Sequence, residues 1–111
     1  MSIKVTVEVL GELALMRTVA KRVSQSIDEL KSIVSEMEEK SKAIETYVSD
    51  SADYLTKLNF RQAEISLDAV ISLARELNEL VHRAQDILSE MLPDIAYLPD
   101  GAEAVESELR R

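Results

Sequence analysis

The chain has 111 residues and a net charge of −8, from 21 acidic and 13 basic residues, and it contains neither Cys nor Trp. The lack of Cys excludes disulfides, thiolate catalysis and Cys-based zinc sites, and the acidic balance argues against binding to nucleic acid or to an anionic membrane. Aliphatic residues carry most of the hydrophobic fraction, while aromatic residues make up 4%, a composition that suits helices packed side by side in one small domain.

Residues 1–11 form an N-terminal arm with two interpretations. From Ile3 to Val9 the β-branched residues alternate with polar ones, which is the period of a strand. Alternatively, Thr6 is an N-cap and the helix that follows begins early. The start Met1-Ser2-Ile3-Lys4 has the pattern of neither a signal nor a transit peptide, and no apolar run approaches ~20 residues. We therefore expect a cytoplasmic protein without a membrane span.

From Glu12 to Val48 the sequence has the pattern of one long helix. Apolar or small residues recur at alternating steps of four and three, which places them along one helical stripe. Leu15, Val19, Ile33 and Tyr47 lie beside this stripe and broaden it, so the helix is expected to contact more than one neighbour. The stripe consists of Val9, Leu13, Met16, Ala20, Val23, Ile27, Leu30, Val34, Met37, Ser41, Ile44 and Val48.

A break is predicted within residues 49–59. Ser49 begins the first polar interruption, and Asn59 followed by Gln62 at the third position has the form of a helix N-cap. The second helix then continues to about Leu92, where Pro93 is expected to end it because proline cannot donate to the backbone ladder. Its stripe is Ala63, Leu67, Val70, Ala74, Leu77, Val81, Ala84, Leu88 and Met91, with a flanking row of Leu73, Leu80 and Ile87.

Residues 93–111 are interpreted as a proline-containing tail with a type I turn at Leu98–Gly101. The whole pattern predicts an all-α, coiled-coil-like antiparallel hairpin over residues 12–92. Two broad apolar stripes exceed what one mutual contact covers, so we predict a homodimer that forms a four-helix bundle, or an obligate hetero-complex. The predicted interface residues are Leu15, Val19, Ile33, Tyr47, Leu73, Leu80 and Ile87.

The residues offer little for catalysis. One His, two Gly and no Cys leave no basis for a catalytic triad or a phosphate loop. Glu79 and His82 match the Glu-x-x-His pattern of di-iron bundles, but both point away from the stripe on a helical wheel. We therefore expect no enzyme activity, no cofactor, no metal and no small-molecule substrate.

The acidic residues have two interpretations: they form a solvated surface, or they form a binding site for a protein partner. The candidates for partner binding are Glu36, Glu38, Glu39, Glu76 and Glu79. The first hypothesis for function is a self-associating adaptor or structural module that binds a protein partner. The alternative is a small inhibitor, for example phage-encoded, that imitates nucleic acid and occupies a basic groove.

A third hypothesis comes from a resemblance. The start Ile3-Lys4-Val5-Thr6, the chain length and the two-helix plan resemble the small secreted hairpins of type VII secretion systems. That family carries Trp-x-Gly at the bend, where this chain has Tyr47-Val48-Ser49-Asp50-Ser51. Its export motif places an acid four residues after an aromatic residue, and Phe60 with Glu64 is the nearest match. The resemblance implies a secreted helical hairpin.

Overall fold

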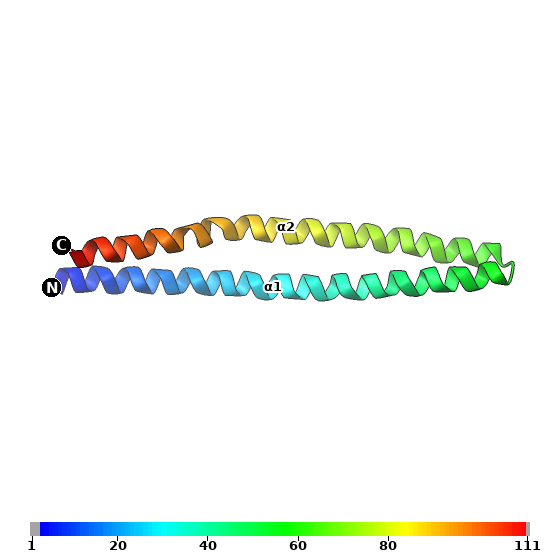
Figure 1. Cartoon of the computed structure of the whole chain (residues 1–111), viewed down its shortest axis with the longest axis horizontal. Helices are drawn as coiled ribbons and strands as arrows, with labels where there is room; N and C mark the ends of the chain where they lie inside the picture. The colour runs from blue at the N-terminus through cyan, green and yellow to red at the C-terminus, as the bar shows by residue number, and fades with distance from the viewer. Residues whose placement is uncertain (1–2, 111) are drawn as a thin grey trace. The chain divides into compact units, whose positions relative to one another are not determined.

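The computed structural model describes residues 3–110 and contains two long α-helices joined by a short turn (Figure 1). Helix α1 spans Ile3–Thr56 and helix α2 spans Phe60–Arg110. The helices are antiparallel and pack against each other, so the predicted all-α hairpin is confirmed. Within the described range no residue lies in a strand. The arm therefore takes the helical alternative, since a lone strand has no partner for its backbone groups.

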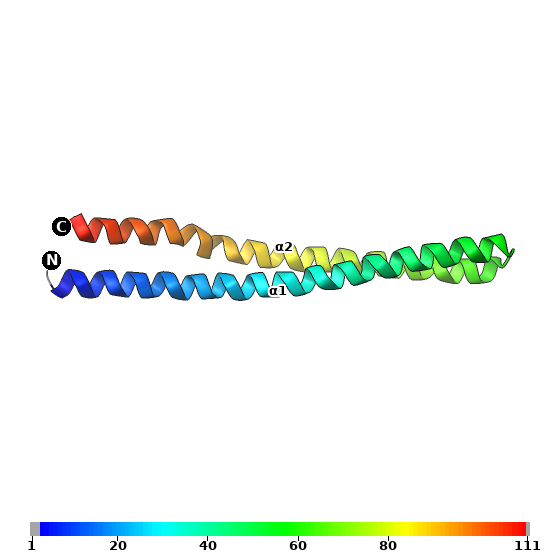
Figure 2. The same cartoon turned by 60° about the horizontal axis from the view of Figure 1, so that its bottom comes forward.

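The hairpin divides into two compact units, each built from a segment of both helices. Unit 1 comprises Met1–Glu29 and Asp86–Arg111, and unit 2 comprises Leu30–Gln85. In unit 1 the start of α1 lies beside the end of α2 in both views (Figures 1 and 2). Unit 2 contains the turn between the helices. Each unit therefore has its own seam between the two helices.

The side chains in these seams follow a seven-residue repeat on both helices. We label the repeat a to g, with Val9 of α1 and Ala63 of α2 at position a. Positions a and d then form the stripe by which each helix contacts the other, as in other heptad-repeat helices. Every buried residue of the described range occupies one of these two positions: Val19, Ile33, Ser51, Ala63, Ser66, Leu80, Ile87, Met91 and Gly101.

Helix α2 continues through Pro93 and Pro99 to Arg110. The prediction that Pro93 ends the helix, with a turn at Leu98–Gly101, is therefore wrong. Both prolines are exposed, so their rings face away from α1. Residues beyond Pro93 still contact α1: Asp94 forms an ion pair with Arg22 at 3.0 Å. These contacts explain why the helix persists in spite of the hydrogen bond that each proline removes.

The turn between the helices closes the end of α1 and starts α2. The Asn59 N–H donates to the Tyr54 carbonyl at 2.8 Å, and the Leu58 N–H donates to the Leu55 carbonyl at 3.0 Å. This pair of bonds satisfies the last carbonyls of α1 in a Schellman motif. The Asn59 Oδ1 accepts from the Gln62 N–H at 3.3 Å, which confirms the predicted N-cap. The break lies at the end of the predicted 49–59 interval.

Leu58 provides a test of this turn, because it has a φ of 58° and lies in the left-handed region. That conformation costs an L-residue about 1–2 kcal/mol, whereas glycine adopts it freely. Glycine also makes the unfolded chain more flexible, which offsets about 0.4–1 kcal/mol of the gain. We expect Leu58→Gly to raise the free energy of unfolding by up to about 1 kcal/mol in urea titrations. Leu58→Val, which is β-branched, is the matched control and is expected to be destabilising.

Candidate functional site

A row of exposed apolar residues follows the seven-residue repeat on both helices at position e, four residues after each a. The large residues of this row expose from 40% of their surface at Leu13 to 65% at Phe60, and Val81 alone among them is half-buried. Its polar members are Thr6 and Ser41. In α1 the row is Thr6, Leu13, Ala20, Ile27, Val34, Ser41, Val48 and Leu55, and in α2 it is Phe60, Leu67, Ala74, Val81, Leu88, Ile95, Ala102 and Leu109.

The e rows of the two helices lie on the same side of the seam. In an antiparallel pair, the e positions of one helix flank the e positions of the other. We call the surface that they form in each unit the apolar face. Unit 1 contributes Thr6, Leu13, Ala20, Ile27, Leu88, Ile95, Ala102 and Leu109, and unit 2 contributes Val34, Ser41, Val48, Leu55, Phe60, Leu67, Ala74 and Val81.

Each unit has a shallow groove on its apolar face, next to the small residue of the α1 row. The groove of unit 1 lies beside Ala20, has a volume of about 580 Å³ and is also lined by Leu10, Leu13, Met16, Arg17 and Leu98. The groove of unit 2 lies beside Ser41, has a volume of about 420 Å³ and is also lined by Val34, Met37, Glu38, Lys42 and Leu77. Both grooves expose mainly carbon atoms, with charged groups only at their edges.

Most of the predicted interface residues lie elsewhere. Val19, Ile33, Leu80 and Ile87 are buried at d positions inside the seams, and Leu73 is half-buried there. They are therefore unavailable to a partner while the hairpin is closed. Leu15 and Tyr47 are exposed, by 45% and 39% of their surface. The sequence is compatible with two apolar stripes on each helix, one made of a and d residues and one made of a and e residues. In the structure the two helices pack against each other through the a and d residues.

The exposed apolar face is more apolar in composition than the d row that packs inside the seams. The d row that packs inside the seams contains six charged or Ser residues, whereas the exposed e row contains two polar residues, Thr6 and Ser41, and no charged one. The polar d residues are Glu12, Ser26, Lys40, Ser66, Asp94 and Glu108.

Ion pairs link the helices on the side opposite the apolar face. The Lys40 Nζ lies 3.0 Å from the Glu76 Oε2 in unit 2, and Arg22 bonds Asp94 at 3.0 Å in unit 1. Arg22 and Glu76 occupy position g, on the other side of the seam from e. Each pair joins one g residue to one d residue, so Lys40 and Asp94 are paired without contact with the apolar face.

The predicted acidic candidates all lie in unit 2 and are exposed, but they do not converge. Glu38 borders the apolar face at position b. Glu36 and Glu76 lie at g, on the opposite side, where Glu76 already pairs with Lys40. Glu39 and Glu79 lie at c, on the outer surface of each helix. The structure therefore distributes these carboxylates over three directions instead of forming one acidic surface.

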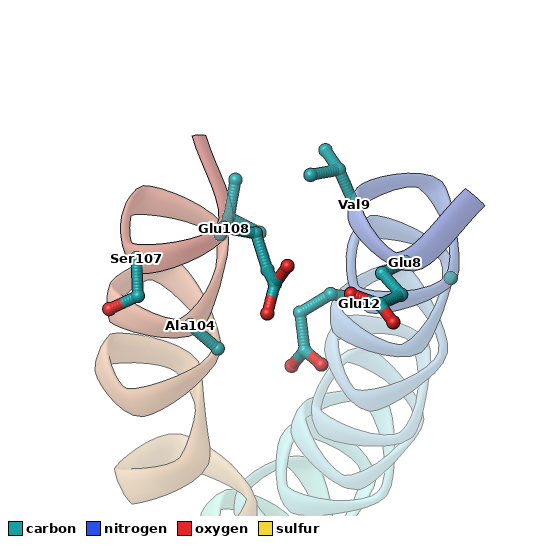
Figure 3. Close-up of a pocket in the computed structure, with 8 residues that line it drawn as sticks. Glu8, Val9, Glu12, Ala104, Ser107 and Glu108 are labelled. Atoms are coloured by element: carbon teal, nitrogen blue, oxygen red, sulfur yellow. The ribbon is translucent and has the colours of Figure 1, made fainter. Parts of the chain in front are cut away.

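A different acidic cluster, which the sequence analysis missed, lies in unit 1. Glu8, Glu12 and Glu108 line a groove of about 540 Å³ between the start of α1 and the end of α2. Figure 3 shows Glu12 and Glu108 directed into the space between the helices. Within residues 3–110 no group of His, Asp and Glu side chains is placed to hold a metal ion. Glu79 and His82 are both exposed on the outside of α2.

Glu12 is also linked to Tyr97, whose hydroxyl donates a hydrogen bond to the Glu12 Oε1. Gly101 makes room for this contact, because a Cβ at that position would lie 3.1 Å from the Glu12 Oε1 and 3.2 Å from the Tyr97 ring. The hydrogen bond to Glu12 raises the pKa of Tyr97 to about 12, with smaller contributions from desolvation and from the Glu12 charge. The bond thus ties α2 to α1 in unit 1.

This shift predicts a loss of stability at high pH. In the unfolded chain Tyr97 ionises near pH 10, about two pH units below its value in the hairpin. The unfolded state therefore releases its proton first, and stability falls as pH rises from about 10 to about 12. We expect Tyr97→Phe to remove the phenolate absorbance step near pH 12 and to shrink this pH-dependent loss. An unchanged titration in the variant would show that Tyr97 is not the group concerned.

Comparison of the chain with protein family models, with curated proteins and with solved structures gave no match. Over the residues that the structure describes, neither helix contains a segment apolar enough to cross a bilayer.

Proposed function

We propose that the chain is a non-enzymatic, coiled-coil-like interaction module that binds a protein partner through the apolar face. The observation that supports the proposal is the contrast between the exposed apolar e rows and the partly polar d rows. We further propose that the protein works in the cytoplasm. A pattern with apolar residues at a, d and e is wider than a two-helix contact needs and is typical of helices in larger bundles.

The chemistry of the face favours a helical partner with an apolar stripe of its own. Removing apolar surface from water contributes roughly 25 cal/mol per Å². The long, shallow grooves beside Ala20 and Ser41 suit side chains that project from a second helix. Such a complex depends little on salt, whereas a complex held by carboxylates weakens as salt rises. The scattered acidic candidates give the decoy hypothesis less support.

A photocross-linking amino acid tests the proposal in the native cell. It replaces Leu67, on the apolar face, or Ser72, an exposed c residue on the other side of the same helix segment. We expect protein adducts from position 67 and few from position 72. Equal yields from the two positions, or none from position 67, would contradict the proposal. The mass of each adduct distinguishes a second copy of the chain from another protein.

A further inference from the structure

We propose that the part of the apolar face in unit 1 binds an amphipathic helix of another protein that carries Asp or Glu along one border of its apolar stripe. In this arrangement the carboxylates of the partner lie beside Arg17 and Lys21. The inference rests on the proposed function and names the chemistry of the partner. All the residues that support it belong to unit 1, which comprises Met1–Glu29 and Asp86–Arg111.

Charged residues are unevenly distributed around unit 1. On the side of the apolar face, positions e, b and f of residues 10–24 and 88–102 hold fourteen residues, all of them exposed. Only Arg17 and Lys21 among them are charged, so we call these fourteen positions the basic apolar patch. The acidic residues of the same two stretches all lie at positions c, d or g: Glu12, Glu90, Asp94 and Asp100.

The patch has apolar residues on both helices but positive charge on only one. Leu10 in α1 exposes 60% of its surface, and Leu92 in α2 exposes 63%. Both cations belong to α1, while the b and f positions of α2 in the patch are uncharged. A helix that covers the patch therefore meets positive charge along one border, and the charge on its own border decides whether it fits.

Arg17 and Lys21 have no acidic partner in the hairpin. They are four residues apart on one helix, a spacing at which like charges repel each other. Apart from each other, their neighbours three and four residues away are uncharged. Within residues 3–110 neither side chain forms an ion pair. A carboxylate from a partner relieves the repulsion, whereas a basic residue at the same place increases it.

Two grooves place an apolar contact next to the cations. Arg17 lines the groove of about 580 Å³ on the apolar face. It also lines a second groove, of about 340 Å³, together with Ala14, Thr18 and Lys21. An apolar side chain of a partner helix suits the first groove, and a carboxylate of the same helix suits the second. The apolar contact then supplies most of the affinity, and the charges select the partner.

The net charge of −8 is compatible with an acidic partner at this site. Interactions between exposed charges more than about 8 Å apart are largely screened at physiological ionic strength. The charges closest to a helix bound on the patch are those of Arg17 and Lys21. An acidic chain can therefore present a surface that favours an acidic helix.

Binding of two designed peptides to the full chain tests the proposal. Both peptides form an amphipathic helix with leucine at a, d and e; one carries glutamate along one border of this stripe, and the other carries lysine at the same places. In fluorescence anisotropy we expect the glutamate peptide to bind at least about tenfold more tightly. The net charge of the chain alone predicts the opposite order. Equal affinities, or tighter binding of the lysine peptide, would overturn the proposal.

Charge reversal locates the binding site. We expect Arg17→Glu with Lys21→Glu to weaken binding of the glutamate peptide by about tenfold or more. The matched control, Lys57→Glu with Arg75→Glu, changes the same residue types at exposed positions of unit 2 and alters the net charge equally. This control is expected to leave the affinity within about twofold. An equal loss in the control would mean that net charge and not the patch sets the affinity, which rejects the proposal.

The outcomes separate this inference from the proposed function. Protein adducts at Leu67 without a preference for the glutamate peptide would reject the inference and leave the proposed function in place. A photocross-linking residue at Leu92 identifies the occupant of the patch in the cell, because the mass of the adduct shows which protein is bound. An adduct of two copies of this chain at that position would also overturn the inference.

Discussion

Replacement of Ile33 by Ala is expected to lower the free energy of unfolding by about 2–5 kcal/mol. Ile33 exposes 2% of its surface and lies at a d position in the seam of unit 2. Truncation removes buried carbon and leaves a cavity that the two helices cannot fully close. The loss is measured by urea unfolding, followed by circular dichroism at a protein concentration low enough to dissociate oligomers.

Ile27→Ala is the matched control for this variant. Ile27 is also an isoleucine in α1, but it lies at position e and exposes 41% of its surface. In the dissociated chain we expect its replacement to cost much less than that of Ile33. If a second copy covers the face, the cost of Ile27→Ala grows as the protein concentration rises, because association contributes to stability. Equal costs for both variants in dilute solution would show that the seam is assigned to the wrong row.

Replacement of Pro93 by Ala is expected to raise the free energy of unfolding by up to about 3 kcal/mol, the difference between proline and alanine inside a helix. Pro93 lies within α2 at an exposed c position. The substitution restores an N–H that bonds the carbonyl of Ser89, four residues earlier, and it removes no buried contact.

The measurement is thermal unfolding of the variant, with Pro99→Ala as a second test at the exposed b position of the same helix. Amide hydrogen exchange adds a local readout, since residues 94–108 should be protected in the natural chain and more protected in the variant. A Pro93→Ala variant no more stable than the natural chain, with unprotected amides after residue 93, would mean that α2 ends at the proline.

The helical hairpin followed from local features that act over a few residues. The steps of four and three, and the Asn59–Gln62 cap, are confirmed because they depend on the period of the helix and on one short turn. The continuation of α2 beyond Pro93 was not predictable from such local features. There the cost of proline competes with contacts such as Arg22 to Asp94, whose partners are 72 residues apart.

The sequence predicted which residues on each helix are apolar, but it did not predict which of them pack inside the hairpin and which stay exposed. On the surface of a helix, position a lies between positions d and e. An a residue such as Met16 can therefore belong to a stripe made of a and d residues or to one made of a and e residues. The more apolar e direction appeared to be the internal seam, and the d residues Val19 and Ile33 appeared to be the interface. The structure packs the d residues inside the hairpin and leaves the e residues exposed, and polar d residues such as Lys40 find partners across the hairpin. Those partners are visible only once the helices are paired.

Sedimentation equilibrium of the full chain at micromolar concentration tests the proposal that the exposed apolar face serves association, and the prediction that the chain forms a homodimer. We predict a mass of twice the 12.4 kDa of one chain. We also predict that Val34→Asp, which places a charge on the face, shifts the equilibrium toward the single chain with its helix content retained. A mass of 12.4 kDa for the natural chain across the whole concentration range would contradict the account.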